Sequence, residues 1–235
     1  MIKLRRLNSV WCFVIIAALL ASCDKASPEP VHTPVSSGVP KSPSVRQEVN
    51  LEQKEKRKNV ISPIVLAARH QIGKTVIYDP TYVGLKYPGG DVPIERGVCT
   101  DVVIRALRDA FSMDLQKLVH EDMKKAFSQY PKIWGLKKPD RNIDHRRVPN
   151  LKKYFERHGY AVAITQNADD YLPGDLVTCT VGHNLAHIMI VSDKKTRNGV
   201  PFVIHNIGSG VKEENRLFDF PITGHYRIKR KTRTE

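Results

Sequence analysis

A cysteine at the start of a predicted helix is the first residue of this sequence that can do chemistry. Cys99 follows a turn-rich segment at 87–93. The residues after it are apolar at a helical spacing: Val102, Val103, Ala106, Leu107, Ala110 and Phe111. We expect a helix to about Phe111 with Thr100 or Asp101 as N-cap. Free amide N–H groups and the helix dipole favour a thiolate there, so Cys99 is either a nucleophile or a small buried side chain.

Two histidines lie in later stretches that alternate as strands do. His187 opens one stretch and His205 lies in the next. A thiol and an imidazole brought together in this way can attack a carbonyl, because the imidazole takes the thiol proton. His183 is a rival base, but it falls in a turn before the strand. Asn206 is the alternative to His205, since the two point to opposite faces of a strand.

The elements that must position these residues read as helices first and strands afterwards. Helical periodicity covers roughly 61–72, 99–111, 115–130 and 148–158. Short alternating stretches rich in β-branched residues follow at 160–165, 175–181, 187–192, 202–206 and 225–229. This order predicts one α+β domain over residues 59–231 with an antiparallel sheet, followed by a tail at 232–235.

The first 22 residues are typical of an export signal. A basic start precedes an uncharged apolar run at 10–21 that is too short to span a membrane comfortably. The run ends in Leu-Ala-Ser-Cys at 20–23, which resembles the lipobox of bacterial lipoproteins. The resemblance implies cleavage before Cys23, a lipid on its sulfur and attachment to a membrane. Asp24 resembles an inner-membrane retention signal, so we expect a periplasmic protein anchored on the inner membrane.

A linker follows the signal, and the net charge of the chain limits the classes of partner that it can bind. Residues 23–58 are a linker rich in proline, serine and charge, with too little apolar surface to fold alone. Removing the three positive charges of residues 1–22 from the net +14 leaves +11. This charge suits nucleic acid, anionic lipid or carboxylate-bearing wall peptides, and export argues against nucleic acid.

Four stretches carry a resemblance to a known superfamily. They are Gly97-Val98-Cys99-Thr100-Asp101, Pro173-Gly174-Asp175-Leu176-Val177, Ala186-His187-Ile188-Met189-Ile190-Val191 and Ile204-His205-Asn206. In this order they resemble the NlpC/P60 superfamily of papain-like cysteine peptidases and, within it, an uncharacterised bacterial subfamily, domain of unknown function 1287. The resemblance implies a papain-like domain with helices packed on an antiparallel sheet. It also implies cell-wall peptides as substrates, with no cofactor or metal.

The resemblance assigns roles by position. It makes Cys99 the nucleophile, His187 the base and His205 the group that orients the base. A tyrosine that touches the substrate in the superfamily has its nearest match in Tyr78. The sequence departs from the usual pattern in two ways: the cysteine is flanked by Val and Thr rather than Asp and Ser, and the charged segment 134–147 is extra.

The remaining candidates are two arginines and a second cysteine. Arg146 and Arg147 in the extra segment are candidates to clamp a substrate carboxylate, and a solvated basic loop is the alternative. The same two interpretations, a substrate contact or a solvated loop, apply to Asp144 and His145. Cys179 lies in an alternating stretch, which favours core packing.

Cysteine chemistry other than catalysis stays open. A disulfide between Cys99 and Cys179 is possible because an exported protein meets an oxidising compartment. A zinc site built from these cysteines and the two histidines lacks the close ligand spacing typical of such sites.

The sequence therefore predicts a lipid-anchored periplasmic cysteine hydrolase that cuts an amide bond, most readily in peptidoglycan peptides, through a thioester at Cys99. One alternative is a catalytically inactive lipoprotein that binds the cell wall or a partner protein. Another is an acyltransferase that uses the same thioester.

Overall fold

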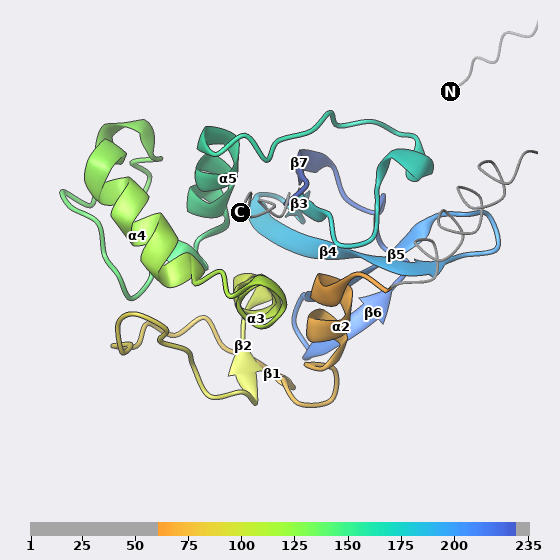
Figure 1. The fold of residues 1–235 in the computed structure, drawn as a ribbon, viewed down its shortest axis with the longest axis horizontal. Coiled ribbons are helices and arrows are strands. Elements are labelled where there is room, and N and C mark those ends of the chain that lie inside the picture. Colours follow the sequence, from red (N-terminus) through yellow and green to blue (C-terminus); the bar gives the residue numbers. More distant parts are fainter. Residues whose placement is uncertain (1–60, 229–235) are drawn as a thin grey trace, which may run out of the picture. The chain divides into compact units, whose positions relative to one another are not determined.

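The computed structural model describes residues 61–228, which form an α+β fold with an antiparallel five-stranded sheet (Figure 1). The helices are α2 (Pro63–Arg69), α3 (Cys99–Phe111), α4 (Leu115–Ala126) and α5 (Val148–Arg157). The strands of the sheet are β3 (Leu176–Val181), β4 (Leu185–Lys195), β5 (Pro201–Asn206), β6 (Val211–Glu214) and β7 (Ile222–Tyr226). The expected export signal, the lipidation site Cys23 and the linker lie outside the described residues. Within 61–228, no helix has the length and apolar character needed to cross a membrane.

The sheet is organised around β4, its longest and central strand. The strand order is β6-β5-β4-β3-β7, and every neighbouring pair is antiparallel. Helices α2, α3 and α5 contact β4, and Figure 1 shows them beside the sheet with α4 farther out. The strand that carries His187 therefore touches both the helical layer and the neighbouring strands.

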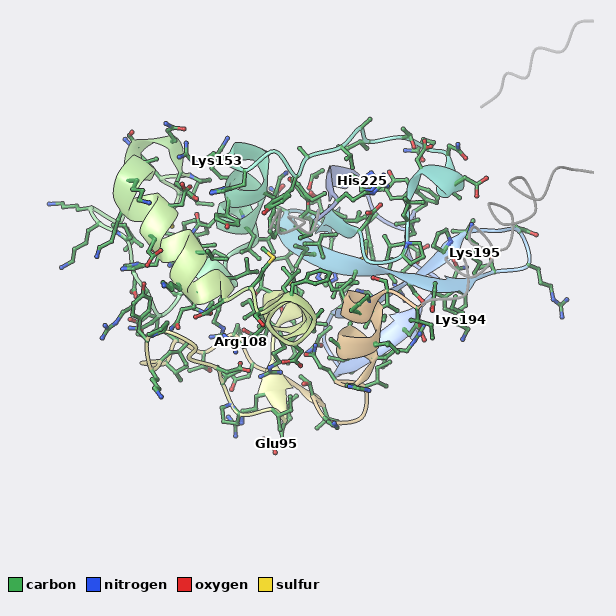
Figure 2. All side chains as sticks on the ribbon, viewed as in Figure 1. Glu95, Arg108, Lys153, Lys194, Lys195 and His225 are labelled. Carbon is green, nitrogen blue, oxygen red and sulfur yellow. The ribbon has the colours of Figure 1, made fainter. Side chains whose placement is uncertain are left out.

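Alternation along the strands divides the core between the two faces of the sheet. The face toward α3 buries Ile188, Ile190 and Ile204 with Val102, Val103 and Leu107 of the helix. The other face buries Val177, Cys179, Met189, Val191 and Val203 with Tyr171 and Leu217. Charged side chains such as Lys153, Lys195 and Glu95 extend at the periphery (Figure 2). Each fully buried aliphatic side chain contributes roughly 1.5–3 kcal/mol, so both clusters fix the position of β4.

Helix α3 begins at the cysteine itself. Val98 is the N-cap, and the Asp101 carboxylate accepts a hydrogen bond from the Val98 N–H at 2.7 Å. The expectation of Thr100 or Asp101 as N-cap is wrong, because Asp101 caps the helix from within its first turn. Cys99 is consequently the first helical residue, where its N–H has no partner within the helix.

The extended segments differ from the sequence expectation in three places. Residues 160–165 form only one isolated bridge, between Ala161 and Tyr226, rather than a strand. Strand β6 was not expected, because an edge strand of this sheet is largely charged. The extended piece that the sequence predicts at 75–78 contains β1 (Ile77–Tyr78), but its parallel pairing with β2 (Arg96–Gly97) was not expected, since two residues carry no periodicity. This small sheet fixes the chain that leads into Cys99.

Candidate functional site

The sulfur of Cys99 lies against the backbone of β4. The backbone N–H groups of Ile188, Thr100 and Cys99 lie close enough to the sulfur to favour its thiolate form. At this end the β4–β5 ladder stops at the pair Ile190 and Ile204, so the Ile188 N–H lies beyond the ladder. Cys99 is 4% exposed.

His187 and His205 form a direct hydrogen bond. Nε2 of His187 lies 2.8 Å from Nδ1 of His205, and the rings meet edge to face at 5.0 Å between centroids. The pairing of Ile190 with Ile204 makes the two histidines diagonal neighbours on one face of the sheet. Both are buried. Of the two candidates for contact with His187, the structure therefore selects His205.

Asn206, the other candidate, holds the segment before the cysteine. Its Nδ2 donates to the Gly97 carbonyl at 2.9 Å, and its Oδ1 accepts from the Gly208 N–H at 3.2 Å. The end of β5 is thereby tied to the residue that precedes the N-cap of α3. Asn206 positions the cysteine rather than the histidine.

The sulfur and the histidine pair lie at adjacent residues of β4 but on opposite sides of the alternating strand. Ile188 is buried toward α3 with Cys99, whereas His187 shares its face with Met189 and Val191. The sulfur lies at the N–H of Ile188, which directly follows His187. Nε2 of His187 faces His205, whereas Nδ1 makes no hydrogen bond to any residue in 61–228. Nδ1 is therefore the ring atom that is left to exchange a proton.

Burial sets the resting protonation of the site. It raises the pKa of the Cys99 thiol to about 11, and the Asp101 charge adds to this, against the three N–H donors. Burial, with the His205 charge second, lowers the pKa of His187 to about 3. Both groups are thus neutral at rest. A thiolate and an imidazolium would form together, because in a buried site each charge stabilises the other.

A carboxylate that the sequence analysis missed extends the pair. Glu214 Oε2 lies 3.3 Å from His205 Nε2, and Arg216 Nε lies 3.2 Å from the same oxygen. Glu214 ends β6, opposite Val203 in the register. No sequence signal identified it, because β6 reads as a charged loop.

A cavity of about 200 Å³ opens beside the cysteine. It is lined by Tyr78, Pro80, Val98, Cys99, Trp134, Ile143, Arg146, Arg147, Val148, Pro149 and Ala186. The Arg147 guanidinium lies 4.1 Å from the centre of the Trp134 ring. Burial, then the charges of Cys99 and Asp101, raise the pKa of Tyr78 to about 12. Tyr78 and Arg147, which the sequence analysis named as candidate substrate contacts, therefore both line the cavity that contains Cys99.

The guanidinium of Arg146 is hydrogen-bonded within the protein. Its Nε and Nη2 donate to the two oxygens of Asp101, each at 2.9 Å, and its other donors reach the carbonyls of Asp79 and Thr81. The side chain is 2% exposed. It joins the loop after Tyr78 to the first turn of α3, which leaves Arg147 as the candidate clamp for a substrate.

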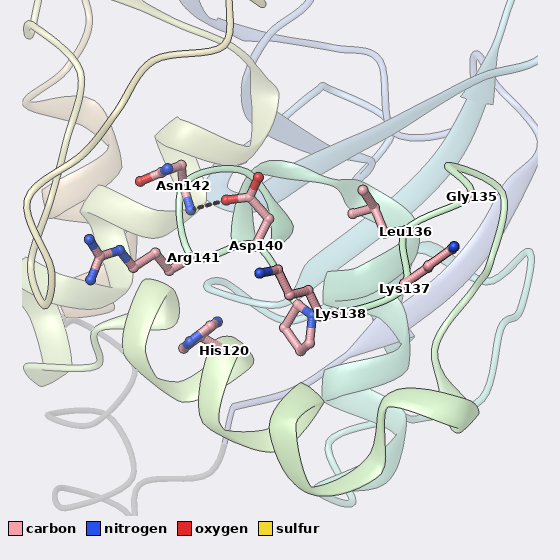
Figure 3. A pocket seen from close by; sticks show the side chains of 9 residues that line it. His120, Gly135, Leu136, Lys137, Lys138, Asp140, Arg141 and Asn142 are labelled. Carbon is pink, nitrogen blue, oxygen red and sulfur yellow. Dashed lines mark hydrogen bonds between the residues drawn. The ribbon is translucent and has the colours of Figure 1, made fainter.

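A larger cavity lies away from the cysteine and lacks a converging donor set. It measures about 620 Å³ and lies between His120 of α4 and residues 135–142. Figure 3 shows the cationic ends of Lys137 and Arg141 pointing in opposite directions, while Asp140 bonds the Asn142 N–H. We therefore place the candidate site at the smaller cavity.

The second cysteine packs in the core. Cys99 and Cys179 are both free and buried, so the disulfide that the sequence left open is not formed. Cys179 belongs to the apolar cluster on the far face of the sheet, as its alternating stretch predicted. Within 61–228, no three His, Cys, Asp or Glu side chains group as metal ligands.

Comparison with known proteins adds a family to this geometry. A family described as a domain of unknown function (DUF1287) matches residues 65–228. A protein of Escherichia coli strain K12, described as uncharacterized protein YijF, is 59% identical over 160 residues, which cover 68% of this chain and 78% of that protein. The matched region contains every residue of the candidate site, and the chain belongs to the DUF1287 family.

Proposed function

We propose that this protein is a papain-like cysteine hydrolase of the NlpC/P60 type that cleaves an amide bond. Cys99 is the nucleophile, His187 the base and His205 the group that orients the base. One observation carries the proposal: the Cys99 sulfur rests on the backbone N–H next to His187, whose Nε2 is held by His205. This arrangement supports nucleophilic catalysis, because the sulfur lies within one residue of the base along β4 and the base is already bonded to its orienting group.

The proposed reaction has two stages. The Cys99 proton passes to Nδ1 of His187 as the sulfur attacks the substrate carbonyl carbon. The resulting oxyanion accepts hydrogen bonds from N–H groups at the start of α3. The imidazolium then protonates the amine as the carbon–nitrogen bond breaks, which leaves a thioester on Cys99. Water, deprotonated by His187, then attacks the thioester carbon. The carbon–sulfur bond breaks, the acid leaves, and the imidazolium returns its proton to the Cys99 sulfur.

We propose peptidoglycan peptides as the substrate and the periplasm as the location. The proposal rests on the export signal and lipobox in the sequence and on the net +11 of the mature chain, which suits a carboxylate-bearing polymer. The cavity agrees in chemistry, since an apolar lining meets the aromatic Tyr78 and the cationic Arg147 at its wall. Lipid on Cys23 would hold the enzyme at the membrane that faces this polymer.

Digestion of purified sacculi tests the proposal. The wild-type full chain should release new muropeptides, and Cys99→Ala should release none. Cys179→Ala is the matched control, because it removes the other buried cysteine of residues 61–228 and should leave digestion unchanged. Identical muropeptide profiles for wild type and Cys99→Ala would contradict the proposal.

The burial of the thiol favours a second candidate function. Cys99 is 4% exposed and its pKa is raised to about 11, as expected for a structural cysteine in a non-catalytic binding module. Iodoacetamide labelling of Cys99 across pH separates the two. A hydrolase requires labelling near neutral pH that is lost in His187→Ala, whereas a binding module leaves Cys99 inert in both proteins.

The thioester would also serve an acyltransferase, so the products must be identified. Digestion in the presence of an added amine distinguishes the two reactions. A free carboxylate at the cut indicates hydrolysis, and an amide to the added amine indicates acyl transfer.

A further inference from the structure

The hydrogen bonds beyond His187 end on a carboxylate. We propose that Glu214 is a positioning residue that fixes the ring tautomers of His205 and His187, so that the lone pair of His187 Nδ1 is left for the Cys99 proton. Its catalytic consequence rests on the proposed hydrolase, whereas the tautomers are a property of the folded protein. Glu214 does not touch the cavity beside Cys99.

The proton positions follow from the donor and acceptor inventory of each group. A carboxylate only accepts hydrogen bonds, so His205 Nε2, 3.3 Å from Glu214, must carry its proton. A neutral imidazole carries one N–H, so His205 Nδ1 is an acceptor. The 2.8 Å contact then requires that His187 Nε2 donates. His187 Nδ1 is consequently unprotonated, as a general base must be.

Burial makes a change in these proton positions energetically costly. His187 and His205 are 4% and 1% exposed, so water cannot replace a lost partner. If His205 took the other tautomer, its Nδ1–H would face His187 and its Nε2 lone pair would face the carboxylate. His187 could keep the bond between the rings only by moving its own proton to Nδ1, and the bond to Glu214 would still be lost, which is costly in a site of low polarity.

Neighbouring charges hold Glu214 and act on His205. Arg216 Nε forms an ion pair at 3.2 Å with the oxygen of Glu214 that contacts the ring, and Asp219 lies 3.7 Å from Arg216. Across the sheet, Lys212 pairs with His205 in the register and is exposed. The charges of Glu214, Arg216 and Asp219 all reach His205, but among them only Glu214 contacts its ring.

Nitrogen-15 NMR of the histidine rings tests the proposal directly. In the full chain at neutral pH, His205 and His187 should both carry the proton on Nε2. Glu214→Ala should mix the two tautomers at both residues. Glu214→Gln should keep the wild-type tautomers, because its amide oxygen still accepts. Asp219→Asn, the matched control, removes a nearby charge without a ring contact and should also keep them.

A second readout follows the chemistry of Cys99. Its rate of alkylation by iodoacetamide, measured at the Cys99 peptide across pH, should fall about tenfold at pH 7 in Glu214→Ala and stay near wild type in Asp219→Asn. A wild-type His205 protonated on Nδ1, or unchanged tautomers in Glu214→Ala, would overturn the proposal. Sacculi that stay intact while the tautomers change as expected would reject the hydrolase and keep the role of Glu214.

Discussion

Asp101 is the residue on which the local geometry of the candidate site depends. One of its oxygens accepts from the Val98 N–H and both accept from Arg146. The carboxylate therefore begins the helix of the nucleophile and anchors the arginine that holds the loop after Tyr78. From the sequence, Asp101 was a candidate cap and Arg146 a candidate clamp. Their pairing depends on how α3 meets a distant loop, which no local pattern encodes.

Breaking the ion pair between Asp101 and Arg146 should strongly destabilise the fold. Both side chains are almost fully buried, so Asp101→Asn keeps the shape but leaves the Arg146 charge unpaired, at a cost of about 3–5 kcal/mol in the free energy of unfolding. Glu156→Gln, which breaks the exposed pair with Lys153, should cost less than about 1 kcal/mol. Urea denaturation at neutral pH measures both. Equal losses would show that the Asp101 pair is not energetically special.

At the scale of elements, periodicity predicted what a long apolar pattern can specify. Helices α3, α4 and α5 and strands β3, β4 and β5 lie close to their expected positions, because each buries a regular apolar face. Strand β6 has no such face, so it and Glu214 were missed together. The contact between His187 and His205 was foreseeable once two alternating strands were expected to pair. The Glu214 contact was not, because it needs the register of an unrecognised edge strand.

The turn that launches β3 gives a prediction at this scale. Gly174 has φ +93°, and a Cβ there would lie 2.6 Å from Ile64 Cγ2 and 2.6 Å from Ser62 Oγ. Gly174→Ala therefore combines backbone strain with a clash against the start of α2. We expect a loss of more than about 2 kcal/mol in the free energy of unfolding.

Gly199 provides the matched control for the turn. It has φ +81°, but a Cβ added there would meet no atom within 4 Å, so Gly199→Ala should lose only the strain, about 1–2 kcal/mol. Urea denaturation of both variants separates the two contributions. A Gly174→Ala protein as stable as Gly199→Ala would mean that α2 moves aside without cost.

For the whole molecule, the site exists only where the layers meet. The cysteine comes from the helical layer and lies at the backbone of Ile188, whereas the two histidines come from the sheet, where β5 leaves β4. The apolar clusters on both faces of the sheet hold that junction in place. Because the site is made by packing, conditions that weaken the fold should disturb it before they touch the chemistry of any single residue.

Mild acid is such a condition, because the fold buries neutral histidines. Burial lowers the pKa of His145 from 6.5 to about 4 and that of His187 from 6.5 to about 3. Their contribution is complete above pH 6.5. It falls as pH decreases toward these values, since the unfolded chain then binds protons that the folded chain refuses. At pH 5 each should cost about 2 kcal/mol.

One buried acid opposes this loss. Burial raises the pKa of Asp144 from 3.8 to about 6, so the folded chain binds a proton there that the unfolded chain does not, and stability rises by about 1 kcal/mol between pH 6 and 5. The stability lost through the two histidines exceeds the stability gained through Asp144. Urea unfolding should therefore show lower stability at pH 5 than at pH 7.5. His145→Gln, which lies outside the proposed relay, should remove about half of the histidine contribution. An unchanged difference between the two pH values in this variant would show that His145 accepts its proton inside the folded protein.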